Sequence, residues 1–205
     1  MNVLVILPLV FVMIGGPQIL SAIFLATSED WRRNSAAFVF GASLSISLVV
    51  TLAYFFGGGV TRQTGSNRPL HLFVLVFLLA AMAHTYLKRE QSEPPAWMGK
   101  LETASPRFSF RLGFLLMGFF PTDVLTSITV GTYLASHGDP LWYAIGFVLL
   151  TLLFLSLPSL ALLTIGDRAE TLLPAVRTWM NTHSWIVSEV VLLVFVGITI
   201  NNLVA

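Results

Sequence analysis

Cysteine is absent from this 205-residue chain, and charged residues are scarce. Without cysteine, structural disulfides, thiol redox chemistry and iron–sulfur ligation are excluded. Charged residues make up 10% of the chain, against about 25% in globular domains, so a conventional water-facing surface cannot form. The formal charge is +1, and we expect no nucleic-acid partner because no basic face is available. Four scattered histidines form no metal cluster, so we predict no metal, no cofactor and no enzymatic activity.

Apolar residues dominate what remains, with 56% of the chain hydrophobic and a mean hydropathy of +0.83. A helix needs about 20 mostly apolar residues to cross a bilayer. Six segments meet this requirement, at residues 2–27, 35–56, 70–87, 108–135, 141–165 and 185–204. The first lacks the basic start and the small-residue cleavage site of a signal peptide, so we expect it in the mature protein. The sequence therefore predicts an all-α integral membrane protein with six transmembrane helices.

The basic residues are distributed unevenly between the two sides of this arrangement. Nine lie in or beside the connections after the first, third and fifth helices, namely Arg32, Arg33, Lys88, Arg89, Lys100, Arg107, Arg111, Arg168 and Arg177. The opposite side has two, Arg62 and Arg68. Because cytoplasmic loops are enriched in Lys and Arg, we predict a multi-pass plasma-membrane protein with those three connections in the cytoplasm and both termini outside.

A short pattern occurs twice, as Gly16-Pro17-Gln18-Ile19-Leu20-Ser21 and as Phe120-Pro121-Thr122-Asp123-Val124-Leu125-Thr126. With one residue inserted, both read as proline, polar residue, apolar pair and hydroxyl. Residues 1–89 and 108–205 are therefore expected to be two three-helix repeats, joined by a cytoplasmic connection at 90–107 that contains a short interfacial helix. An odd number of spans per copy inserts the copies from opposite faces, which is the inverted-repeat plan of secondary transporters.

Proline predicts a break in the first helix of each copy. It removes a backbone donor and clashes with the preceding turn, so the helices are expected to break at Gly15-Gly16-Pro17 and at Pro121. Freed backbone groups persist in hydrocarbon only where protein or a wet cavity satisfies them. Matched breaks therefore predict a site near the membrane midplane, with a pair of simple packing kinks as the alternative.

Asp123 lies near the middle of the fourth predicted helix, and no helix core contains a Lys or Arg to neutralise it. A carboxyl group in this position is suited to carry a proton or to coordinate a cation. The alternative is that Thr122 or Asp123 caps the second half of the broken helix. Gln18 has the related position in the first copy, and its amide both donates and accepts hydrogen bonds.

The predicted substrate and ion pathway comprises Gly15, Gly16, Pro17, Gln18, Ser21, Pro121, Thr122, Asp123, Thr126 and Glu189, with Ser127 and Thr129 as further cavity-lining hydroxyls. Glu189, near the start of the sixth helix, is expected either to join a proton route or to reach water. Ser43, Ser47 and Thr51 share one face of the second helix, where bonds to their own carbonyls or helix packing are expected. Small residues at every fourth position around Gly41 and Gly131 predict close helix packing.

Several of these motifs resemble one known family. Gly15-Gly16-Pro17-Gln18, the turn from Ser28 to Arg33, and Gly41 resemble the opening of lysine-exporter superfamily proteins. The middle of the chain resembles the GAP branch of that superfamily, the peptidoglycolipid- or sulfolipid-addressing proteins. The residues that carry this likeness are Pro95-Ala96-Trp97-Met98, Leu101, Pro106, Gly113, Pro121 and Asp123-Val124-Leu125.

The resemblance implies six helices in two inverted halves and the export of a lipid or glycolipid. The branch usually has Asn-Pro-Lys-Asn at the second break, where this chain has Phe120-Pro121-Thr122-Asp123. The missing lysine weighs against an anionic cargo, and the acid favours a proton- or cation-linked mechanism. We therefore predict an alternating-access exporter of a lipid or amphiphile, with membrane lipids as its surroundings and a homo-oligomer left open. The alternatives are efflux of an amino acid or other small solute, and a scaffold of a lipid export complex that does not itself transport.

Overall fold

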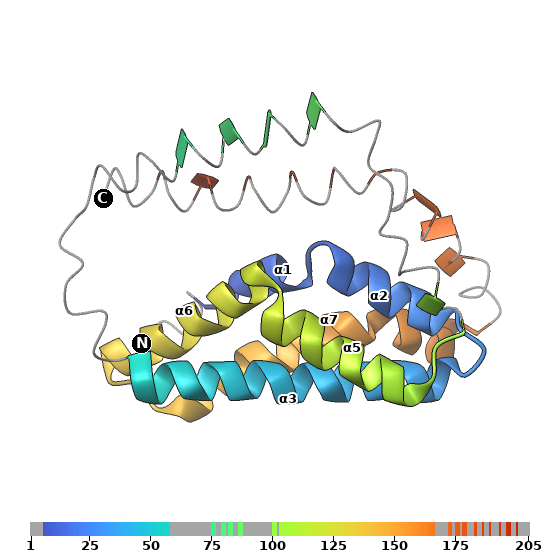
Figure 1. Cartoon of the computed structure of the whole chain (residues 1–205), viewed down its shortest axis with the longest axis horizontal. Helices are drawn as coiled ribbons and strands as arrows, with labels where there is room; N and C mark the ends of the chain where they lie inside the picture. Colours follow the sequence, from blue (N-terminus) through green and yellow to red (C-terminus); the bar gives the residue numbers. More distant parts are fainter. Residues whose placement is uncertain are drawn as a thin grey trace.

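The structure is a computed structural model that describes residues 6–57, 100–101 and 103–166, with isolated positions between 75 and 87 and between 172 and 200. Its described residues form helices and turns, without a strand among them. The helices are α1 (Leu9–Ile14), α2 (Pro17–Ala26), α3 (Trp31–Gly57), α5 (Pro106–Phe119), α6 (Pro121–His137), the short 3-10 helix η5 (Leu141–Tyr143) and α7 (Ala144–Ile165) (Figure 1). The all-helical prediction is confirmed for this part of the chain.

Both predicted breaks are present. The segment expected to form the first span is divided into α1 and α2, with Gly15 and Gly16 between them. The segment expected to form the fourth span is divided into α5 and α6, which are bent by 65° at Phe120. In each case the second helix begins with proline, at Pro17 and Pro121, because the fixed φ of proline suits the first helical position and its missing N–H has no intrahelical partner to lose.

The long helix α3 is the element around which the others pack. It contacts both halves of the bent pair α5–α6, and it also contacts α2 and α7 (Figure 1). Its buried stripe, at every fourth residue, is Phe38, Ala42, Ile46 and Val50, each at most 1% exposed. This spacing keeps the four side chains on one face of the helix.

Glycine allows α3 to approach α5 and α6 closely. A Cβ atom on Gly41 would collide with the backbone carbonyl of Phe110, and one on Gly113 would collide with that of Phe38. A Cβ atom on Gly131 would meet the carbonyl of Val50. The close packing predicted around Gly41 and Gly131 is therefore confirmed, and the reciprocal role of Gly113 adds to it.

The outer faces of these helices are apolar as well. Phe40, Leu48 and Phe55 of α3 are 67%, 48% and 68% exposed, and Leu149 of α7 is 60% exposed. A helix that is apolar on all sides is typical of a membrane environment. By length and composition α3 and α7 can each cross a membrane, and the bent pair α5–α6 adds a third crossing if it forms one span.

The remaining expected spans, 70–87 and 185–204, lie mostly outside the described residues, as does most of the connection at 90–107 that is expected to contain a short interfacial helix. The positions described within 70–87 and 185–204 are helical. The six-span order, the inverted repeat, the division at 89 and 108 and the membrane topology therefore stay predictions.

Candidate functional site

The first helix break is built from two consecutive glycines. Gly15 is extended, and Gly16 has φ +101° and ψ −138°, a backbone conformation that only glycine adopts readily. The chain thereby ends α1 and begins α2 at Pro17, with no side chain capping the new helix. Gln18, the second residue of α2, is completely buried.

The second helix break is centred on Phe120, which is extended with φ −69° and ψ 127°. Phe120 is the residue that precedes α6, and no side-chain hydrogen bond caps the helix. The alternative that Thr122 or Asp123 caps this helix is therefore wrong, because both lie inside its first turn. Asp123 there faces the positive end of the helix dipole.

The two breaks meet at a side-chain hydrogen bond. Gln18 Nε2 donates to Asp123 Oδ2 at 2.6 Å, across 105 residues of sequence, and both side chains are 0% exposed. Thr122 Oγ1 lies 3.4 Å from Asp123 Oδ1 and is its second described partner. The N-terminal turns of α2 and α6 thus contribute one polar residue each to a buried centre, which we call the Gln18–Asp123 pair.

Two polar atoms in or near this pair have no hydrogen-bond partner among the described residues. They are Gln18 Oε1 and Ser127 Oγ, both buried. An unpaired buried acceptor or hydroxyl costs about 1–3 kcal/mol, so such atoms are uncommon without a reason. The centre therefore has hydrogen-bonding capacity available for a ligand, a proton carrier or a changed conformation.

The other predicted pathway residues differ in where they lie. Ser21 and Thr126 are buried close to the breaks, and their hydroxyls donate to the carbonyls of Pro17 and Thr122, four residues earlier. Thr129 is exposed and bonded to the carbonyl of Leu125, so it does not join the centre. Glu189 is an isolated described position whose Oε1 is buried without a described partner.

Three hydroxyls on α3 differ from the sequence prediction. Ser43, Ser47 and Thr51 line a cavity of about 510 Å³ between α3 and α7, and none of the described hydrogen bonds involves them. By contrast, Thr151 and Ser156 on the facing helix α7 donate to their own helix. Of the two expectations for these hydroxyls, bonds to their own carbonyls are therefore wrong, and helix packing stays a prediction. Their shared face was visible in the sequence, but the cavity beside it was not.

Comparison with curated proteins and with solved structures found no significant match. Within the residues that the structure describes, no group of three His, Cys, Asp or Glu side chains is arranged to hold a metal. One family model, "Sap, sulfolipid-1-addressing protein", matches residues 6–202, which include both helix breaks and nearly the whole chain. The resemblance to the sulfolipid-addressing branch is confirmed, and the chain belongs to the sulfolipid-1-addressing protein family.

Proposed function

We propose that this protein exports a lipid, glycolipid or similar amphiphile across the membrane by alternating access around the Gln18–Asp123 pair. Membership of the sulfolipid-1-addressing family supports a membrane protein involved in lipid export. The observation that carries the mechanism is the 2.6 Å hydrogen bond that joins two broken helices inside the protein. Broken helices that meet in this way are typical of the central sites of secondary transporters.

The packing of the broken helices supports a site that opens alternately to the two sides. α1 contacts α6, and α2 contacts α5, so the first half of each broken helix lies against the second half of the other. This crossed arrangement is what two copies inserted from opposite faces would produce. A small rotation of one broken helix against the other would change which half-helices enclose the pair.

Asp123 is the residue that we assign to the coupling of transport to a proton or a cation. Its carboxyl group is buried, it lies in the first turn of a half-helix, and its described partners are the neutral groups of Gln18 and Thr122. A proton or a cation is therefore the partner that would change its charge state during a cycle. In this proposal, loading Asp123 with a proton or a cation changes its hydrogen bonding to Gln18, and this change alters how the two breaks are held together.

The test is transport by the purified full chain in liposomes, with and without a pH gradient. We expect the wild type to move a fluorescent glycolipid or phospholipid between leaflets faster in one gradient direction, and we expect Asp123→Asn to lose that dependence. Asp30→Asn is the matched control, because Asp30 is exposed in the turn between α2 and α3. Wild-type transport and gradient dependence in both Asp123→Asn and Asp123→Ala would refute the coupling role.

The same liposomes separate this function from its alternatives. An amino acid or other small-solute exporter would release a trapped solute while leaving the lipid label in place. A scaffold protein would move neither on its own. Lipid movement by the protein alone, without added nucleotide or partner, is the result that the proposed function requires.

A further inference from the structure

A second region of the molecule, between α3 and α7, has the features of a lipid-binding site. The cavity of about 510 Å³ continues into another of about 560 Å³, and the two share Ser43 and Leu152 as lining residues. We call the combined depression the α3–α7 groove. Along α3 it is lined from Trp31 to Thr51, a rise of about 30 Å at 1.5 Å per residue, which matches the hydrocarbon thickness of a typical bilayer.

The walls of the groove are mostly apolar, both aliphatic and aromatic, and a row of hydroxyls without described hydrogen bonds follows α3. Ser35 lines the groove at 7% exposure, and its Oγ is buried without a described hydrogen-bond partner. Ser43, Ser47 and Thr51 continue the row, and no described hydrogen bond involves them. A hydroxyl facing hydrocarbon without a partner is unfavourable, so this row favours an occupant that carries hydrogen-bonding groups, such as the headgroup and ester linkages of a lipid.

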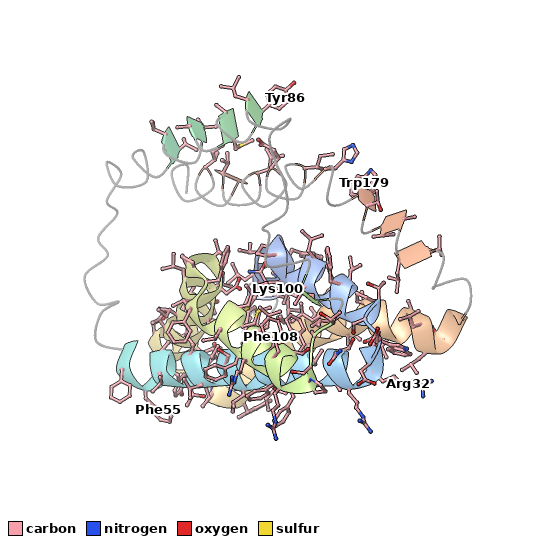
Figure 2. The ribbon with its side chains drawn as sticks, turned by 45° about the vertical axis from the view of Figure 1, so that its right-hand side comes forward. Arg32, Phe55, Tyr86, Lys100, Phe108 and Trp179 are labelled. Carbon is pink, nitrogen blue, oxygen red and sulfur yellow. The ribbon has the colours of Figure 1, made fainter. Side chains whose placement is uncertain are left out.

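Charge distinguishes the two ends of the groove. Among the described residues that line either cavity, Arg32 alone is charged, and its guanidinium lies 5.2 Å from the centre of the Trp31 ring. Figure 2 shows Arg32 and Phe55 at opposite ends of α3. Trp142 lines the groove towards the Phe55 end. In the predicted topology Arg32 is cytoplasmic, so a molecule with a negative headgroup would be attracted to that end.

We propose that the α3–α7 groove binds one anionic membrane lipid, with the headgroup beside Arg32 at the Ser35 end of the hydroxyl row, and with the acyl chains against the leucines of α7. None of its lining residues belongs to the Gln18–Asp123 pair, so this is a separate site. The missing lysine weighs against an anionic cargo at the Pro121 break only, because Arg32 supplies a positive charge at this second site. The inference rests on the proposed function because it takes the bound lipid to be the cargo. That cargo would enter the groove from the cytoplasmic leaflet.

The absence of cysteine makes a direct binding test practicable. Ser47→Cys in the groove and Leu48→Cys, at the adjacent exposed residue that does not line it, can each carry a single bimane label. The full chain is placed in phosphatidylcholine vesicles containing increasing amounts of doxyl-labelled phosphatidylglycerol or doxyl-labelled phosphatidylcholine. With the label at position 47 we expect half-quenching at an about fivefold lower mole fraction of the anionic lipid, as one arginine near the membrane surface would give. With the label at position 48 the two lipids should quench equally.

A second substitution tests whether Arg32 causes the preference for the anionic lipid. Arg32→Gln in the Ser47→Cys background should bring the two quenching curves together, whereas Arg33→Gln, at a residue that does not line the groove, should leave them apart. Equal quenching by both lipids in the labelled Ser47→Cys protein that retains Arg32 overturns the proposal. Quenching of the label in Leu48→Cys but not in Ser47→Cys also overturns it, because protein, either another part of this chain or a second copy, would then fill the groove.

This binding test and the transport test fail independently. Quenching requires neither transport nor Asp123, so the lipid preference of the label at position 47 should persist when Asp123→Asn is added. A protein that binds the anionic lipid in the groove but moves no lipid would contradict the proposed function alone. A protein that transports lipid with no lipid preference at position 47 would contradict the groove alone.

Discussion

Gln18 and Asp123 follow the two prolines that restart the broken helices, by one and two residues respectively, and their side chains meet at 2.6 Å. Only the nitrogen of the Gln18 amide is hydrogen-bonded, because its oxygen, Oε1, has no described partner. A structural cross-link alone would gain from a partner at both atoms of the amide. Gln18 Oε1 is therefore available for the changed contact that the proposed transport cycle requires.

The first prediction separates the structural and functional roles of Asp123. Asp123→Leu removes the only described partner of the buried Gln18 amide, so it should lower the free energy of unfolding by about 1–3 kcal/mol. Asp123→Asn should leave that free energy close to the wild-type value, because its carbonyl still accepts from Gln18 Nε2 and its new N–H group offers a donor beside Gln18 Oε1. Chemical denaturation of the full chain in nanodiscs measures both.

The folded variant Asp123→Asn tests the functional role of the carboxyl group in transport. Asp123→Asn should be folded yet insensitive to a pH gradient, since asparagine cannot take up a proton. A folded Asp123→Asn protein with normal coupling would show that the carboxyl group has only a structural role.

The second prediction concerns the close contact between α3 and α5. Gly41→Ala places a Cβ atom against the backbone carbonyl of Phe110, which cannot rotate away, so we expect a loss of about 1–3 kcal/mol in unfolding free energy. Gly146→Ala on α7 is the matched control, because a Cβ atom there meets nothing within 4 Å. Equal stability of the two variants would mean that α3 and α5 are not in close contact.

The helix breaks could be predicted from sequence because their causes are local. Proline at positions 17 and 121 has no N–H to donate and suits the first turn of a helix, and Gly16 permits the positive φ that precedes the first of them. The likeness of the two motifs also pointed to Gln18 and Asp123 as related positions. Their direct contact depends on how four half-helices pack, and no local pattern encodes that packing.

The α3–α7 groove could not be predicted from the sequence. The shared face of Ser43, Ser47 and Thr51 follows from helical spacing, but a hydroxyl can either donate to its own helix or face outward. Which of the two a hydroxyl does depends on the helix that faces it, and here Leu149 and Leu152 of α7 line the same cavity. The alternative that Thr122 or Asp123 caps α6 was wrong because Phe120 precedes the helix and both residues lie inside its first turn.

The third prediction concerns Asn34, which connects the start of α3 to the segment before α5. Its completely buried Nδ2 donates to Ser28 Oγ and to the carbonyl of Ala104, at 2.9 Å in each case. Asn34→Ala leaves both acceptors without this donor, and we expect a loss of about 1–3 kcal/mol in unfolding free energy. Ser136→Ala, at an exposed hydroxyl that bonds within its own helix, should change it little. An unchanged unfolding midpoint in Asn34→Ala would show that this connection does not stabilise the fold.

The last prediction compares two glycines with positive φ. Gly138 ends α6 in the left-handed conformation, with φ +68° and ψ 18°, which asparagine also adopts, so Gly138→Asn should be nearly neutral. Gly16 has φ +101° and ψ −138°, outside the left-handed region, so asparagine there is strained by about 1–3 kcal/mol. That strain acts on the break that positions Gln18, and we therefore expect Gly16→Asn to reduce lipid transport as well as stability, whereas Gly138→Asn preserves both. Measured in the same proteoliposomes, wild-type transport by a folded Gly16→Asn protein would show that the conformation of the first break is not needed for the transport cycle.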